Sequence, residues 1–148
     1  MSRGACRLIH VVQERIFSSV NNPLLRIIVD PPRPPAFNMA ADLYLLKQSA
    51  LNPRTVYVRF YMWEPPTISI GWMQNAATVL DMTLLERDRV AWIRRPTGGR
   101  AVLHKGDVTY SVAFPKAVCA MGTTVHQTYS VIAGCLVNGL TRAGITAS

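Results

Sequence analysis

The chain has 148 residues, 49% of them hydrophobic, which is typical of one globular domain with a moderate core. Its three cysteines are odd in number and form no C-x-x-C pair, so they indicate a reducing, cytoplasmic compartment rather than a disulfide framework. No segment has the roughly 18 consecutive apolar residues of a membrane span, and no His or Cys spacing is typical of a metal site.

The chain is strongly basic, with 13 Arg and 3 Lys against 8 acidic residues, a formal net charge of +8 and an isoelectric point near 10.0. Such a balance usually indicates a nucleic-acid partner. Arginine, however, suits fixed recognition of one anion. Several arginines gather near one turn rather than along a basic helix: Arg87, Arg89, Arg94, Arg95 and Arg100. We therefore favour a small anionic ligand or an acidic protein over nucleic acid.

Residues 1–24 are mildly basic, with Arg3, Arg7 and Arg15 against Glu14, and contain no cleavable apolar core. They fit either a weak transit peptide or an extension without function, and we favour the extension. Prolines at 31, 32, 34 and 35 predict a stiff connector that is not helical.

An amphipathic helix is predicted over about 39–50, with Asn38 as its N-cap. The residues expected on its core face are Met39, Leu43, Leu46 and Ala50.

Residues 55–63 alternate with period two and predict a strand. One face carries Val56, Val58, Phe60 and Met62. The other carries Tyr57, Arg59, Tyr61 and Trp63, and we interpret it as a half-exposed sheet face. After a Pro-Pro turn, residues 67–71 predict a second strand.

The remaining elements are a short helix around 79–88, strands over 91–95 and 108–114, and a helix over about 125–143. Thr124 and Gln127 fit a capping box for the last helix, and Gly144 fits its C′ position. Its expected core face is Tyr129, Ile132, Leu136 and Leu140. The order of elements predicts an α+β fold, with helices packed on a mixed or mostly antiparallel sheet.

Residues 94–104 read Arg-Arg-Pro-Thr-Gly-Gly-Arg-Ala-Val-Leu-His. A glycine pair lets backbone N–H groups approach a ligand, and nearby guanidinium groups offer a bidentate fork for carboxylate or phosphate. An ordinary hairpin turn is an equal alternative on local grounds. The dinucleotide-binding and P-loop fingerprints do not fit.

This segment, continued by Gly106-Asp107-Val108-Thr109-Tyr110-Ser111, resembles the signature of the lipoate–protein ligase A and octanoyltransferase family, within the biotin/lipoate A/B ligase superfamily. Residues 37–42, 59–66 and 67–74 resemble further blocks of that family in the same order. The resemblance runs from about residue 25 to the end of the chain. The biotin-ligase form of the glycine loop is absent.

The resemblance implies a truncated fold of the class II aminoacyl-tRNA synthetase and biotin–lipoate ligase type, with residues 1–24 as an extension and residues 25–148 as a partial catalytic domain. It implies an acyl- or adenylate-binding segment of Arg95, Gly98, Gly99, Arg100, Ala101, Val102, Leu103 and His104. Ser69, Gly71, Tyr110 and Ser111 are expected to line the pocket. We expect His104 to line the pocket or orient the loop, not to act as a base.

The implied function is attachment of lipoate or octanoate to a lysine of lipoyl domains, in 2-oxoacid dehydrogenases or the glycine cleavage H protein. A ligase would use ATP and Mg²⁺, whereas a transferase would take the acyl group from acyl carrier protein. The alternative is a non-catalytic basic module that binds an acidic protein or nucleic acid.

The family's acyl-contacting lysine, in a G-x-K-[IV]-[AS]-G motif, and the transferase cysteine find no match in the sequence. Lys105 and Lys116 are in the wrong place for that lysine, and Cys119 lies too early for that cysteine. We therefore expect no catalytic residue within these 148 residues, and we expect the lysine and the cysteine to lie beyond Ser148. We also expect an unpaired sheet edge and an uncovered apolar helix face.

Overall fold

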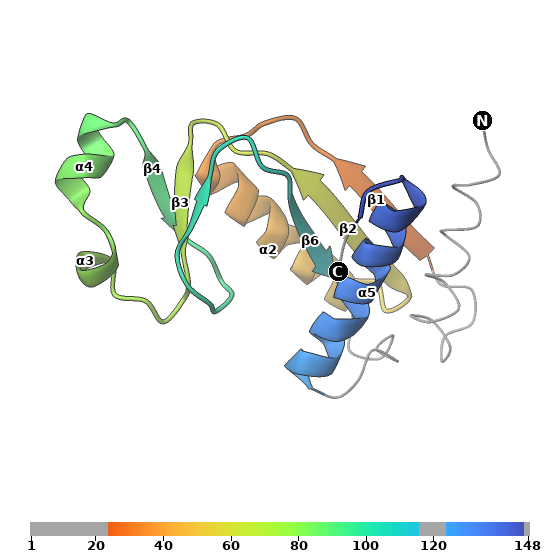
Figure 1. The fold of residues 1–148 in the computed structure, drawn as a ribbon. Coiled ribbons are helices and arrows are strands. Elements are labelled where there is room, and N and C mark those ends of the chain that lie inside the picture. The colour runs from red at the N-terminus through yellow and green to blue at the C-terminus, as the bar shows by residue number, and fades with distance from the viewer. Residues whose placement is uncertain (1–23, 116–123, 147–148) are drawn as a thin grey trace.

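The structure is a computed structural model that describes residues 24–115 and 124–146 (Figure 1). Its elements are β1 (Leu24–Val29), α2 (Pro35–Leu51), β2 (Thr55–Tyr61), β3 (Thr67–Ile70), α3 (Ala76–Val79), α4 (Met82–Arg87), β4 (Ala91–Arg94), β5 (Val102–His104), β6 (Thr109–Ala113) and α5 (Val125–Arg142).

The described strands form two three-stranded mixed sheets, in the orders β1-β2-β6 and β4-β3-β5. β1 is parallel to β2, and β6 is antiparallel to it. In the second sheet β4 is parallel to β3, and β5 is antiparallel to it. The predicted α+β fold with a mixed sheet is confirmed. β1 and β5, which no sequence pattern predicted, complete the two sheets.

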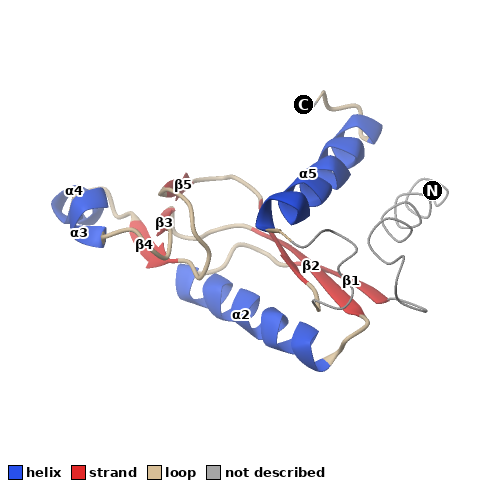
Figure 2. Cartoon of the chain, turned by 90° about the horizontal axis from the view of Figure 1, so that it is seen from below, coloured by secondary structure: helices blue, strands red, loops and turns tan. Residues whose placement is uncertain are grey.

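Helices α2 and α5 cover opposite faces of the first sheet (Figure 2). Leu45 of α2 packs with Tyr57 and Ala113, whereas Val131 and Ile132 of α5 pack against Val56. Successive residues of a strand point to opposite faces, so β2 is buried on both. The prediction of a half-exposed face is wrong for this reason.

The face of β2 that α2 covers contains a buried charged residue, Arg59, which is only 1% exposed. Its guanidinium donates from Nε to Asp30 Oδ2 at 2.7 Å, and from one terminal nitrogen to Asp42 Oδ1 at 3.0 Å. It also donates to the main-chain carbonyl and the side-chain oxygen of Asn38. The Tyr61 ring lies 4.0 Å below it, and the Tyr61 hydroxyl donates to Asp42. Burial raises the pKa of that hydroxyl, and the Asp42 charge raises it further.

Asn38 does not cap α2, so that prediction is wrong. The helix begins at Pro35 after Pro34, without a side-chain cap, because a proline in the first turn has no N–H to satisfy. The predicted non-helical proline run therefore ends one residue early. Asn38 instead lies inside the helix and donates to the carbonyl of Met62 at 3.0 Å.

The predicted core face of α2 is also partly wrong, since Leu43 and Leu46 are exposed. The residues that α2 buries are Asn38, Met39, Leu45 and Ser49. Two of these, Asn38 and Ser49, are polar, so a search for periodic hydrophobic residues does not identify the buried face. The outer side of α2 leaves large apolar side chains exposed: Phe37, Leu43, Tyr44, Leu46 and Leu51.

The single helix predicted around 79–88 is two short helices, each with its own N-cap, Asn75 for α3 and Asp81 for α4. The last helix agrees with its prediction, including the capping box of Thr124 and Gln127. Its predicted core face is only partly correct, because Tyr129 and Leu140 are exposed. No helix within 24–115 and 124–146 is long and apolar enough to cross a membrane.

Replacing Arg59 with alanine should lower the free energy of unfolding by about 3 kcal/mol, because two carboxylates and the Asn38 oxygens lose their donor in a largely dry site. Urea unfolding measures the loss. Arg87→Ala is the matched control, since Arg87 pairs with Asp88 in solvent. Equal stability of the two variants would contradict this role of Arg59.

Candidate functional site

The glycine loop, residues 95–101, connects β4 to β5. Because β4 and β5 lie on either side of β3, the loop crosses the end of β3, and the hairpin interpretation is wrong. Trp72 N–H donates to the Thr97 carbonyl at 2.9 Å. A Cβ on Gly71 would collide with the carbonyl oxygen of Gly99, so β3 and the loop touch backbone to backbone. Gly99 also has a positive φ of 96°, which favours glycine.

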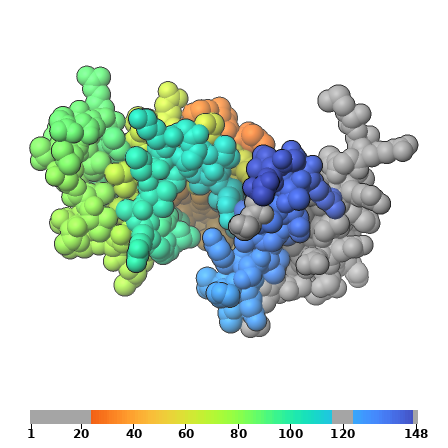
Figure 3. All heavy atoms as spheres, in the orientation of Figure 1, coloured from red at the N-terminus to blue at the C-terminus, as the bar shows by residue number. Residues whose placement is uncertain are grey.

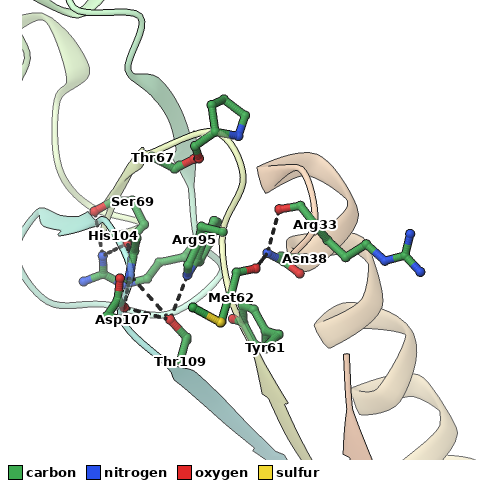
Figure 4. A network of polar contacts seen from close by, with 12 residues as sticks. Arg33, Asn38, Tyr61, Met62, Thr67, Ser69, Arg95, His104, Asp107 and Thr109 are labelled. Carbon is green, nitrogen blue, oxygen red and sulfur yellow. Dashed lines mark hydrogen bonds and ion pairs between the residues drawn. The ribbon is translucent and has the colours of Figure 1, made fainter. Parts of the chain in front are cut away.

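Arg95 holds this loop from inside. Its Nε and one terminal nitrogen both donate to the Gly98 carbonyl, and that terminal nitrogen also donates to the Arg100 carbonyl at 2.7 Å. The other terminal nitrogen donates to the carbonyl and the hydroxyl of Ser69 (Figure 4). A guanidinium has five N–H donors, and these five bonds use all of them. In this conformation Arg95 has no donor left for a ligand fork and acts through the loop.

The direction of the two carbonyls fixes the direction of two N–H groups. In a trans peptide the N–H points opposite to the carbonyl of the preceding residue, and both peptides here are trans. Because the carbonyls of Gly98 and Arg100 face Arg95, the N–H groups of Gly99 and Ala101 point away from it. A Cβ on Gly98 would meet nothing within 4 Å. The loop therefore turns two backbone donors away from its own arginine and leaves open space at the Cβ position of Gly98.

Arg94, the neighbour of Arg95, holds a different segment. One of its terminal nitrogens donates to the carbonyls of Gly71, Trp72 and Gln74 at 3.0, 2.8 and 2.6 Å. Gly71 N–H donates in turn to the Gln74 side chain. Arg94 therefore holds the turn that follows β3 against the end of β4.

The arginine cluster predicted from the sequence is dispersed in the structure. Arg87 pairs with Asp88 in solvent, and Arg89 lies just beyond the C-cap of α4 with a positive φ of 54°. Arg100 lies in the exposed glycine loop, and within 24–115 and 124–146 its guanidinium has no hydrogen-bond or ion-pair partner. Arg100 is therefore free, among the described residues, to meet an anion directly from within the loop. In a space-filling view, the loop and β5 lie at the surface between α4 and α5 (Figure 3).

His104 is the last residue of β5 and is 7% exposed. Its Nε2 is 2.9 Å from Ser69 Oγ, and its Nδ1 is 2.9 Å from Asp107 Oδ2. Burial would raise the pKa of Asp107, but the hydrogen bonds that its carboxylate accepts, above all the one from His104, outweigh burial and lower that pKa below its usual value. Sequence reasoning gave no role to Asp107, although a carboxylate three residues after a histidine across a glycine turn was a usable signal.

The other predicted site residues divide into two groups. Ser69 and Gly71 are buried at the end of β3 against the loop, so their pocket-lining role stays a prediction, and Val102 and Leu103 are exposed on β5. Ser111 lies on the first sheet and donates to Asp42 at 2.7 Å, so it belongs to the Arg59 network. Tyr110 is its exposed neighbour, and burial raises the pKa of its hydroxyl.

No three His, Cys, Asp or Glu side chains of the described residues gather in a way that holds a metal ion. Lys105 is exposed in the turn after β5. Lys116 and Cys119, weighed from the sequence, lie outside the described residues, and so does Ser148. The expectation that the catalytic lysine and cysteine lie beyond Ser148 therefore stays a prediction.

Residues 34–148 match the sequence model of the lipoyl protein ligase A/B catalytic domain. Octanoyltransferase LipM of Geobacillus kaustophilus is 42% identical over 114 residues, which cover 77% of this chain and 41% of that protein. LipM of Bacillus subtilis is 37% identical, with 76% and 41% covered. The chain thus spans less than half the length of these relatives.

Solved structures share the fold. A lipoate-protein ligase A bound with ATP is similar with a TM-score of 0.69 at 22% identity, over 85% of this chain and 49% of that one. A bipartite lipoate protein ligase from Thermoplasma acidophilum is similar with a TM-score of 0.68 at 21% identity, over 86% and 48%.

The two glycines Gly71 and Gly98 should respond differently to alanine. Gly71→Ala forces its methyl group into the Gly99 carbonyl, which is backbone and cannot swing away, so we expect a loss of about 1–3 kcal/mol in unfolding free energy. Gly98→Ala enters open space and should leave stability nearly unchanged. Thermal or urea unfolding of the pair measures this. A Gly71→Ala variant as stable as Gly98→Ala would show that the loop does not rest on β3.

Proposed function

Because the chain belongs to the lipoyl protein ligase A/B catalytic domain family, we propose that it forms the glycine-loop part of a site that transfers an octanoyl group to a lysine of a lipoyl domain. The observation that carries this proposal is that the N–H groups of Gly99 and Ala101 point away from the loop's own arginine, whose donors are fully engaged. Attachment of octanoate or lipoate to protein is the activity that the relatives' names describe.

The choice of octanoyl transfer over ATP-dependent ligation rests on the degree of similarity. The LipM octanoyltransferases are 37–42% identical to the chain. The ATP-bound ligase, at 22% identity, shows the fold alone. We therefore place the ligase route, with ATP and Mg²⁺, second. None of these comparisons supports a non-catalytic basic module.

The loop geometry fits an anionic acyl donor. The outward N–H groups of Gly99 and Ala101 suit a phosphate or a carbonyl oxygen, and Arg100 adds a charge-assisted bond. Gly98 leaves room for the ligand to approach the backbone. Val102 and Leu103, exposed on β5, supply apolar surface beside the loop. In the transfer route the anion is the phosphopantetheine phosphate of acyl carrier protein, and in the ligase route it is the acyl-adenylate.

The proposed partners are an acyl carrier protein as donor and a lipoyl domain as acceptor. A lipoyl domain also appears with the bipartite ligase from T. acidophilum. The net charge of +8 suits acidic partner surfaces. The proposal requires an acyl-contacting lysine and a cysteine nucleophile, and within 24–115 and 124–146 no residue near the loop matches either of them.

Calorimetric titration with S-octanoyl-4′-phosphopantetheine tests the proposal. We expect binding that weakens about tenfold or more in Arg100→Ala, the loss of one hydrogen bond to a charged group. Arg142→Ala, at an exposed position in the last turn of α5, is the control and should bind normally. ATP and duplex DNA are titrated in parallel.

Two outcomes would contradict octanoyl transfer. Tighter binding of ATP than of the octanoyl ligand would favour the ligase route. Tight duplex binding that persists at high salt would favour a nucleic-acid module, since phosphate contacts alone weaken steeply as salt rises.

A further inference from the structure

Ser69, His104 and Asp107 lie in a row, in the hydroxyl–imidazole–carboxylate order of hydrolytic triads (Figure 4). Two features argue against a nucleophile. Ser69 is 2% exposed, so no acyl carbon reaches its hydroxyl. Its Oγ also accepts a bond from Arg95 at 3.1 Å. The row ends at the arginine that holds the glycine loop, not at a substrate.

The proton positions along this row follow from its ends. Asp107, with its lowered pKa, is a carboxylate and only accepts hydrogen bonds. His104 therefore carries a proton on Nδ1 and donates it to Asp107. Ser69 Oγ accepts from Arg95, and its own buried O–H requires an acceptor, which His104 Nε2 provides. Every donor is satisfied when His104 is the neutral Nδ1–H tautomer.

The carboxylate end of the row is held by the first sheet. Thr109 Oγ1 on β6 accepts from Trp63 Nε1 at 2.7 Å and lies 3.3 Å from Asp107 Oδ2. The Trp63 ring also stacks on His104, with centroids 4.4 Å apart and an interplanar angle of 17°. Since Ser69 and His104 belong to the second sheet, the row joins the two sheets.

We propose that Ser69, His104 and Asp107 are positioning residues that orient the guanidinium of Arg95 toward the carbonyls of the glycine loop. His104 in its Nδ1–H form turns the Ser69 hydroxyl so that its oxygen faces Arg95. With that acceptor in place, the remaining Arg95 donors reach Gly98 and Arg100. This inference rests on the proposed function, because orienting Arg95 matters only if the glycine loop binds a ligand. The orientation itself is a property of the ligand-free protein and can be measured without a ligand.

Nitrogen-15 NMR of the histidines tests the proton order. We expect the Nδ1–H tautomer for His104 at neutral pH, with exposed His126 as the internal reference. Asp107→Asn keeps the shape of the side chain but offers an N–H donor, so His104 should shift toward the Nε2–H tautomer. Asp88→Asn, an exposed carboxylate, is the control and should leave His104 unchanged. A native His104 that carries its proton on Nε2, alone or as well, would overturn the proposal.

The Arg95 Nε–H signal reports the other end of the row, because that N–H donates to Gly98. In Ser69→Ala its exchange with water should quicken about tenfold or more, as expected when a bond to a charged group is lost. Ser130→Ala on α5 is the control, since its hydroxyl bonds only the neighbouring helix turn. Unchanged exchange in Ser69→Ala, or covalent labelling of Ser69 by a fluorophosphonate probe, would overturn the proposal. Both readouts are made without ligand, so failure of octanoyl binding leaves their result intact.

Discussion

The arrangement of the first sheet and α2 depends on one desolvated guanidinium group, that of Arg59. Arg59 is buried in the central strand of the first sheet, and an arginine cannot discharge itself at any ordinary pH. Protein oxygens must therefore replace the lost hydration. They come from the end of β1 through Asp30 and from one side of α2 through Asn38 and Asp42. The hydrogen bonds that Arg59 requires thus set how the first strand and the first helix meet β2, and they explain why α2 buries Asn38.

The same principle recurs at the glycine loop with a different class of acceptor. Arg95 also has its donors engaged, but mostly by main-chain carbonyls, so the feature that it fixes is a loop conformation rather than a helix position. The backbone contact between Gly71 and Gly99 restricts the loop from the other side. A loop held in this way meets a ligand with its N–H groups already aimed, which lowers the entropy lost on binding. In the proposed function this arginine would contribute to recognition through the loop, without touching the ligand.

Sequence reasoning succeeded where the determining interactions are local. The capping box of α5 lies within four residues and was predicted with its partners. The alternation of β2 predicted the strand, but its burial on both faces depends on tertiary packing against α2 and against α5, which lies far away in sequence. Asn38 was predicted to be an N-cap because no residue near it in sequence indicates that its two oxygens accept hydrogen bonds from Arg59. The three-residue strand β5 exists because it pairs with β3. The glycine loop was found through family resemblance, whereas the inward orientation of Arg95 depends on Ser69, 26 residues earlier.

The central claim is that the loop binds through outward N–H groups while Arg95 stays engaged inside. Amide and arginine side-chain NMR signals, followed during titration with S-octanoyl-4′-phosphopantetheine, test it most directly. The account predicts that the amide signals of Gly99 and Ala101 shift most among the loop residues, while the Arg95 Nε–H signal keeps its position and its slow exchange. A moving Arg95 Nε–H signal with unmoved Gly99 and Ala101 amides would show that the arginine itself captures the ligand, and would contradict the account.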